Sequence, residues 1–164
     1  MNLKTILFII CSLFTGRSVL AQLKATPVCP PFAVDVMSGT VNNIQPKSAI
    51  VEIQTTFPCS TEMIEKDGNG ICAGVFYKDK DIYFYTDRQY IEIGEKFKGK
   101  LTPHLIGISR SSLFSLLGYP KLKDANWDAF QMGYGTLILY YNKAGKIIKL
   151  QISNKSTDAI KLCE

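Results

Sequence analysis

The 164-residue chain contains one histidine and one tryptophan, and it lacks the common catalytic motifs. His104 has no second imidazole with which to share a metal ion, as the HExxH pattern requires. No GxSxG or SxxK pattern supplies an activated serine. These absences argue against an enzyme built on a known motif, and we expect neither a cofactor nor a metal.

A short apolar run lies at the N-terminus. Lys4 precedes the apolar residues 5–14, and residues 19–21, which end at Ala21, are small or branched, as signal peptidase requires. This order is typical of a secretory signal peptide, so we expect residues 1–21 to be removed. The run is too short to span a bilayer as a helix, and Cys11 follows isoleucines where lipidation requires a small residue. We therefore expect a secreted or periplasmic protein with no stable membrane anchor after cleavage.

The chain has little excess of one charge. It carries 19 basic and 14 acidic residues, and loss of Lys4 and Arg17 with the signal peptide would leave a net charge of +3. The only tight basic group comprises Lys96, Lys98 and Lys100, and no groove-binding motif surrounds it. A scattered basic bias of this size favours solubility and does not indicate a nucleic-acid partner.

Four cysteines follow the expected signal peptide: Cys29, Cys59, Cys72 and Cys163. An even number of cysteines in an exported chain favours disulfides over a thiol hydrolase that would use His104. The C-x-x-C spacing of a four-thiolate zinc site is absent. Three pairings are possible, among them a short loop from Cys59 to Cys72 with Cys29–Cys163 clasping the termini.

The first half predicts a proline-rich extended leader, a short helix and several strands. Pro46 suits a first helical turn, Ile50 and Ile53 share a face, and Phe57 with the following proline ends the helix. β-branched and aromatic residues then predict strands over residues 71–77, 82–86 and 90–93. Residues 94–100 are expected to form a connecting loop.

The second half predicts another short helix, which Ser109 or Ser111 can cap. Its leucines lie at i, i+3 and i+4 spacing: Leu113, Leu116 and Leu117. Gly118 can adopt the left-handed conformation that ends a helix, and Pro120 cannot continue one. The helix is therefore expected to stop abruptly before the chain enters a sheet.

A β-hairpin is predicted near the C-terminus, with Gly145 supplying positive φ in its loop. In the second arm apolar and polar side chains alternate, with Ile148, Leu150 and Ile152 on one side and Lys149, Gln151 and Ser153 on the other. This alternation is typical of a half-buried antiparallel strand.

The two halves share an order of elements. Residues 44–58 and 106–120 both run from isoleucine through a short helix to aromatic-proline, at an offset of 62 residues. We therefore predict an α+β fold of two tandem helix-plus-antiparallel-hairpin units, with a shared sheet and short helices packed on one face. The expected organisation is a signal peptide (1–21), an extended leader (22–43), a first unit (44–101) and a second unit (102–164).

The aromatic cluster is the most informative feature, because six of residues 76–90 are Phe or Tyr. On the strand IYFYT, Ile82 and Phe84 share one face while Tyr83 and Tyr85 share the other. Tyrosines directed away from the core are enriched in recognition surfaces. We predict a partner-binding face made by Tyr83, Tyr85, Tyr90 and Trp127; packing of the tyrosines beneath the second helix is the alternative.

Carboxylates offer weaker candidates for chemistry. The sequence DGNG (67–70) lacks the further acidic ligands of a calcium loop and indicates a plain turn. Glu92 and Asp128 are the carboxylate pair that would act in the alternative function, a cell-envelope hydrolase.

A third hypothesis is an envelope scaffold subunit. The leading prediction is a non-enzymatic protein that binds or inhibits another envelope or extracellular protein.

Residues 106–153 resemble the SmpA/OmlA-like outer-membrane assembly lipoproteins and the β-lactamase-inhibitor-protein-like fold. The resemblance lies in Ser/Arg before Leu-x-x-Leu-Leu-Gly-x-Pro, a Trp/Tyr-containing link, and the hairpin LILYYNKAGKIIKLQI. It implies tandem repeats, a binding function through an aromatic sheet face, and a bridge between Cys59 and Cys72. The lipidation cysteine and a cysteine pair in the second half are absent from this chain.

Overall fold

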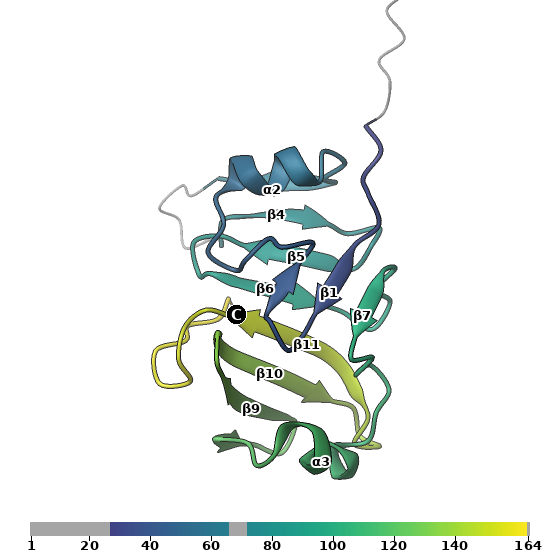
Figure 1. The fold of residues 1–164 in the computed structure, drawn as a ribbon, viewed down its shortest axis with the longest axis vertical. Helices are drawn as coiled ribbons and strands as arrows, with labels where there is room; N and C mark the ends of the chain where they lie inside the picture. The colour runs from purple at the N-terminus through teal and green to yellow at the C-terminus, as the bar shows by residue number, and fades with distance from the viewer. Residues whose placement is uncertain (1–26, 66–71, 164) are drawn as a thin grey trace, which may run out of the picture.

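The computed structural model describes residues 27–65 and 72–163. The expected signal peptide and the DGNG turn lie outside the described residues. The described part consists of two β-sheets and two short α-helices (Figure 1), so the expected small α+β fold is confirmed.

The large sheet has eight strands in the order β3-β4-β5-β6-β11-β10-β9-β8, and all neighbours are antiparallel. Its strands are β3 (Glu62–Ile64), β4 (Gly74–Tyr77), β5 (Ile82–Tyr85), β6 (Tyr90–Ile93), β8 (Leu122–Lys123), β9 (Trp127–Met132), β10 (Gly135–Tyr141) and β11 (Ile147–Ser153). Strands β6 and β11 join the two halves of the chain at the centre of the sheet.

A small sheet in the order β2-β1-β7 was not predicted. Its strands are β1 (Ala33–Asp35), β2 (Thr40–Val41) and β7 (Lys100–Thr102). They come from the expected leader and from the end of the expected 94–100 loop. Strands of two or three residues are too short to display a clear period of two, which is why the sequence pattern missed them.

One hydrophobic core joins the two sheets and the helices. Val34 and Leu101 of the small sheet belong to the same buried cluster as Ile82 and Phe84 of β5. Ile82 and Phe84 are 0% and 2% exposed, which confirms that they face the core. We call this the inner face of the large sheet and the opposite side its outer face.

Helix α2 (Ile50–Thr56) closes the inner face at one end of the large sheet, and α3 (Phe114–Leu117) lies at the other end (Figure 1). Ile53 is buried and Ile50 packs against the core, as their spacing predicts. The helix begins four residues later than Pro46 and ends before Phe57 as expected. Phe57 stacks on Phe32 with ring centroids 4.3 Å apart, which fixes the leader against this end of the core.

The second helical segment consists of a 3₁₀ turn, η1 (Arg110–Ser112), and one turn of α-helix, α3 (Phe114–Leu117). Neither serine caps it through its side chain. Gly118 has φ of 73° and ends the helix as predicted. Leu113 is buried, but Leu116 is 43% exposed, because the single helical turn does not place all three leucines on the core.

The predicted hairpin is present as β10 and β11, and Gly145 has φ of 69°. A bulge near Tyr141 shifts the register, so that Ile147 rather than Ile148 belongs to the core. The predicted alternation therefore holds for Leu150 and beyond and is wrong at the start of the strand. A one-residue insertion moves a side chain to the opposite face.

The four cysteines form two disulfides, Cys29–Cys59 and Cys72–Cys163, with Cα atoms 5.3 and 6.1 Å apart. The Cys59–Cys72 bridge implied by the resemblance is therefore wrong. The Phe32–Phe57 stack brings the leader beside the end of α2, which places Cys29 near Cys59.

Two disulfides favour a location outside the reducing cytoplasm. No helix in the described ranges has the length and apolar character needed to cross a membrane.

Candidate functional site: the outer face of the large sheet

All four predicted contact residues lie on the outer face of the large sheet. Tyr83 lies opposite Glu92, and Tyr85 lies opposite Tyr90. Trp127 lies opposite Tyr140 at the far side of the sheet. Four strand spacings of about 4.8 Å separate β5 from β9, or roughly 19 Å. The face thus brings together aromatic residues that are 44 positions apart in the sequence.

Three of the four keep partial exposure, but Tyr90 does not. Tyr83, Tyr85 and Trp127 are half-buried, whereas Tyr90 is 1% exposed. The Tyr90 ring stacks on Tyr85 at 4.5 Å, and its hydroxyl accepts a hydrogen bond from the backbone N–H of Cys163 at 3.3 Å. Tyr90 therefore packs beneath Tyr85 and the C-terminal segment and supports the face. The prediction that Tyr90 is a contact residue is wrong, because its side chain is buried.

The C-terminal segment, residues 154–163, covers part of the outer face. The Thr136 hydroxyl of β10 donates to the carbonyl of Lys155 at 2.7 Å. The backbone N–H of Thr157 donates to the Gln131 side chain of β9 at 3.2 Å. The segment then returns to Cys163, which the disulfide holds beside Tyr90. Sequence patterns gave no sign of this cover, because the segment forms no regular element.

A pocket of about 430 Å³ lies between the C-terminal segment and the sheet. Aromatic and apolar side chains dominate its lining: Leu122, Trp127, Ala129, Ile138, Tyr140, Ile160, Lys161 and Leu162. Trp127 is thus both a predicted contact residue and a wall of a concave site. A pocket of this size and lining is large enough to hold an apolar group.

A polar network occupies the centre of the outer face. The Tyr140 hydroxyl donates to Gln151 Oε1 at 2.9 Å, and Gln151 Nε2 donates to Glu92 Oε2 at 2.6 Å. Lys149 Nζ lies 3.3 Å from the same carboxylate and 4.3 Å from the Tyr140 ring centroid. Burial and the nearby Glu92 charge raise the pKa of Tyr140 to about 12. Tyr140 therefore remains a neutral donor at physiological pH and holds the network in one arrangement.

Tyr83 and Tyr85 also remain neutral phenols. Burial raises the pKa of both, with the negative charges of Asp81 and Glu92 adding to the effect at Tyr83 and that of Glu92 at Tyr85. The Tyr83 hydroxyl donates to Asp81 Oδ1 at 3.3 Å, which orients the ring at the edge of the face. Both rings contact Phe76, with centroids 5.9 and 5.1 Å away. These contacts therefore hold the two tyrosine rings in place.

Glu92 and Asp128 cannot form the acid pair of a glycosidase. Glu92 lies on the outer face, whereas Asp128 is opposite Leu139 on the inner face and is 3% exposed. Asp128 accepts hydrogen bonds from Arg110 and from the Tyr141 hydroxyl. The sheet separates the two carboxylates, so they do not face each other across a cleft.

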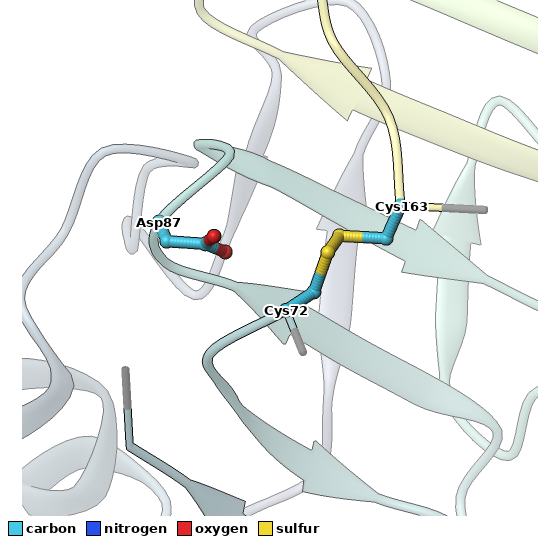
Figure 2. A group of neighbouring side chains, drawn as sticks. All are labelled: Cys72, Asp87 and Cys163. Carbon is cyan, nitrogen blue, oxygen red and sulfur yellow. A yellow bond between two sulfur atoms is a disulfide. The ribbon is translucent and has the colours of Figure 1, made fainter. Parts of the chain in front are cut away.

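Three potential metal ligands do come together, at the start of β4. Ligand atoms of Cys72, Asp87 and Cys163 lie within 4.8 Å of one another (Figure 2). The two sulfur atoms are bonded to each other, so neither is available as a thiolate. With the disulfide formed, the group offers a metal only the Asp87 carboxylate. The disulfide holds the C-terminal segment against the sheet. His104 is exposed and lies apart from this group in the sequence.

Tyr140 and Ile138 are residues of the face that the sequence analysis missed. The predicted hairpin contained both, but its first arm is a continuous apolar run, GTLILYY, in which the two faces cannot be told apart.

The chain matches no family model, no curated protein and no solved structure.

Proposed function

We propose that this chain is an exported, non-enzymatic protein that recognises another envelope or extracellular protein through the outer face of its large sheet. The observation that supports this most directly is the shared face of Tyr83, Tyr85 and Trp127, which keep partial exposure beside an apolar pocket. Tyrosine and tryptophan give large contact areas at little entropic cost, and they are enriched among the residues that dominate binding energy.

The dimensions of the face suit a protein partner. Eight strands at about 4.8 Å spacing extend over roughly 34 Å. This width matches that of a standard protein–protein interface, which covers about 800 Å² on each partner. The Tyr140 network and the stacked Tyr90 ring hold its side chains in place, which lowers the entropy lost on binding.

The two-unit organisation belongs to the same proposal. A short helix followed by four antiparallel strands occurs in residues 50–93 and again in residues 110–153. The last strands of the two sets, β6 and β11, pair at the centre of the sheet. This order, together with the resemblance of residues 106–153, supports a duplication in which neither unit could bury its inner face alone.

A pull-down with tagged residues 22–164 from native envelope and culture supernatant tests the binding function. The test variant carries Tyr83→Ala, Tyr85→Ala and Trp127→Ala. The matched control carries Val51→Ala and Met63→Ala, which shorten exposed apolar side chains elsewhere. Tyr90 stays unchanged, because its truncation would open a cavity and destabilise the fold by about 3–5 kcal/mol.

We expect a protein that the wild type and the control retain and the triple variant loses. Circular dichroism melting of all three proteins separates loss of binding from loss of fold. A partner retained equally by the triple variant would place the interface elsewhere. Recovery of no protein in any arm would contradict the proposed function.

A further inference from the structure

A second surface with unpartnered apolar side chains lies on α3 and the turn after it. Three of the eight exposed large apolar side chains of the described residues occur within residues 114–119: Phe114 (56% exposed), Leu116 (43%) and Tyr119 (83%). We call these three the α3 patch. The Phe114 and Tyr119 rings contact each other with centroids 4.5 Å apart. Such clustering of exposed apolar groups marks an interaction site more often than scattered ones do.

The α3 patch borders a pocket of about 490 Å³. Phe114 and Tyr119 contribute to its wall, and the buried side chains of Leu113 and Phe130 give it an apolar base. Asp128 also lines it, but its charge is matched by the Arg110 guanidinium, which also donates to the carbonyls of residues 124 and 125. The pocket therefore combines an apolar base with an Arg110–Asp128 pair whose charges match each other.

Charge is distributed unequally along the chain, and the pocket lies in the basic half. Residues 22–103 carry nine basic and ten acidic residues, whereas residues 104–164 carry eight basic and four acidic. Lys123 lines the pocket, and Lys143 and Lys146 flank Gly145, which lines it too. Within residues 27–65 and 72–163, none of these three lysines forms an ion pair. Asp124 follows Lys123 and its negative charge acts on Arg110, so it offsets part of this charge, and three lysines against this one carboxylate leave the surroundings of the pocket net positive.

We propose that the α3 patch and its pocket bind an acidic segment of a partner protein. A large apolar side chain of that segment fills the pocket against Phe114 and Tyr119. Flanking carboxylates then pair with Lys123 and with the lysines of the β10–β11 loop. An anionic bilayer is the competing occupant. A concave pocket favours a discrete side chain over a bilayer, which would contact only the rim.

This surface is distinct from the aromatic outer face. Asp128 and Phe130 reach the α3 pocket from the inner side of β9, whereas Trp127 and Ala129 line the other pocket from the outer side. Period-two alternation along one strand therefore supplies both sites. Substitutions of exposed side chains in one site leave the walls of the other intact, so the two proposals can fail independently.

Selection from a phage-displayed library of random twelve-residue peptides tests the inference without a known partner. Wild-type protein is compared with Phe114→Ser/Tyr119→Ser and with Lys123→Glu/Lys146→Glu. The matched controls are Val51→Ser/Met63→Ser for the apolar change and Lys47→Glu/Lys96→Glu for the charge change. All four control positions are exposed and precede residue 100, outside the residues that line the α3 pocket.

We expect enrichment of peptides with one aromatic or leucine residue flanked by Asp or Glu. The synthesised consensus peptide should bind the apolar variant at least about tenfold more weakly than the wild type and the controls. The charge variant should bind the peptide about fivefold more weakly, or weaker still. A higher salt concentration should weaken binding to the wild type, because salt screens partly exposed ion pairs.

Three results would overturn the proposal. The first is enrichment no greater for the wild type than for Phe114→Ser/Tyr119→Ser, and the second is a consensus peptide without acidic residues. The third is co-sedimentation with vesicles of phosphatidylcholine and phosphatidylglycerol (3:1) that depends on Phe114 and Tyr119, in the absence of peptide enrichment. That outcome would assign the surface to a membrane.

Discussion

The buried ion pair of Arg110 and Asp128 gives the sharpest test of the structure. Arg110→Met removes the positive charge and keeps most of the apolar length of the side chain. Asp128 is 3% exposed, so its carboxylate would keep only the Tyr141 hydroxyl as partner. Breaking a buried pair in this way destabilises a protein by about 3–5 kcal/mol. We expect the lower end, near 3 kcal/mol, because the Arg110 side chain is 25% exposed and water can enter once it is shortened.

The reverse substitution should be milder. In Asp128→Asn, Arg110 keeps its hydrogen bonds to the carbonyls of Asp124 at 2.7 Å and Ala125 at 3.1 Å. The new amide oxygen can still accept from the guanidinium and from Tyr141. We therefore expect a loss of only about 1–2 kcal/mol, the scale of a weakened hydrogen bond.

Urea unfolding followed by fluorescence of Trp127, the only tryptophan, measures both losses. Lys121→Met is the control: its partner Asp158 is 70% exposed, so removing this surface pair should change the free energy of unfolding by less than about 1 kcal/mol. If Asp128→Asn lowered the free energy of unfolding as much as Arg110→Met does, the reasoning would be refuted. The expected difference arises because Arg110→Met leaves a buried carboxylate without its cation, whereas Asp128→Asn does not.

Two further predictions concern the disulfides and the tyrosines. Non-reducing peptide mapping should recover the disulfides Cys29–Cys59 and Cys72–Cys163. In the chain-entropy model, serine replacement of the first pair, 30 residues apart, should lower the free energy of unfolding by about 3–4 kcal/mol. Replacement of the second pair, 91 residues apart, should lower it by about 4–5 kcal/mol. Recovery of Cys59–Cys72 instead would contradict the fold of the leader. The pKa of Tyr140 is raised from its ordinary value of 10.0 to about 12, so its stabilising contribution is complete below pH 10 and is lost as the pH rises through 12. Absorbance titration at 295 nm should show tyrosine ionising later in the native than in the urea-unfolded protein, and coincident curves would contradict the burial.

Local patterns predicted much of the large sheet. The alternation of Ile82 and Phe84 with Tyr83 and Tyr85 identified the inner and outer faces of β5 correctly. Gly118 has the positive φ expected at the end of a helix. These features depend on a few neighbouring residues, so a local pattern suffices to find them.

Long-range features could not be predicted in this way. The disulfide pairing depends on how the leader packs on Phe57, which no local pattern encodes. Tyr90 lies in a strand that was predicted correctly, yet it is buried because Cys163, 73 positions away, is held above it. The candidate site was thus identified by strand alternation, while the exposure of its members depended on a segment without regular structure.

The position of the C-terminal segment gives the outer face its shape. A flat antiparallel sheet with exposed aromatic residues offers contact area but no concavity. Residues 160–162 raise one wall above Trp127 and Tyr140, and the disulfide at Cys163 fixes that wall covalently. The outer face therefore has a preformed apolar pocket at one side and half-buried tyrosines at the other. Because Cys72, two residues before β4, holds this wall through the disulfide, the first half of the chain helps to fix a pocket that residues of the second half line.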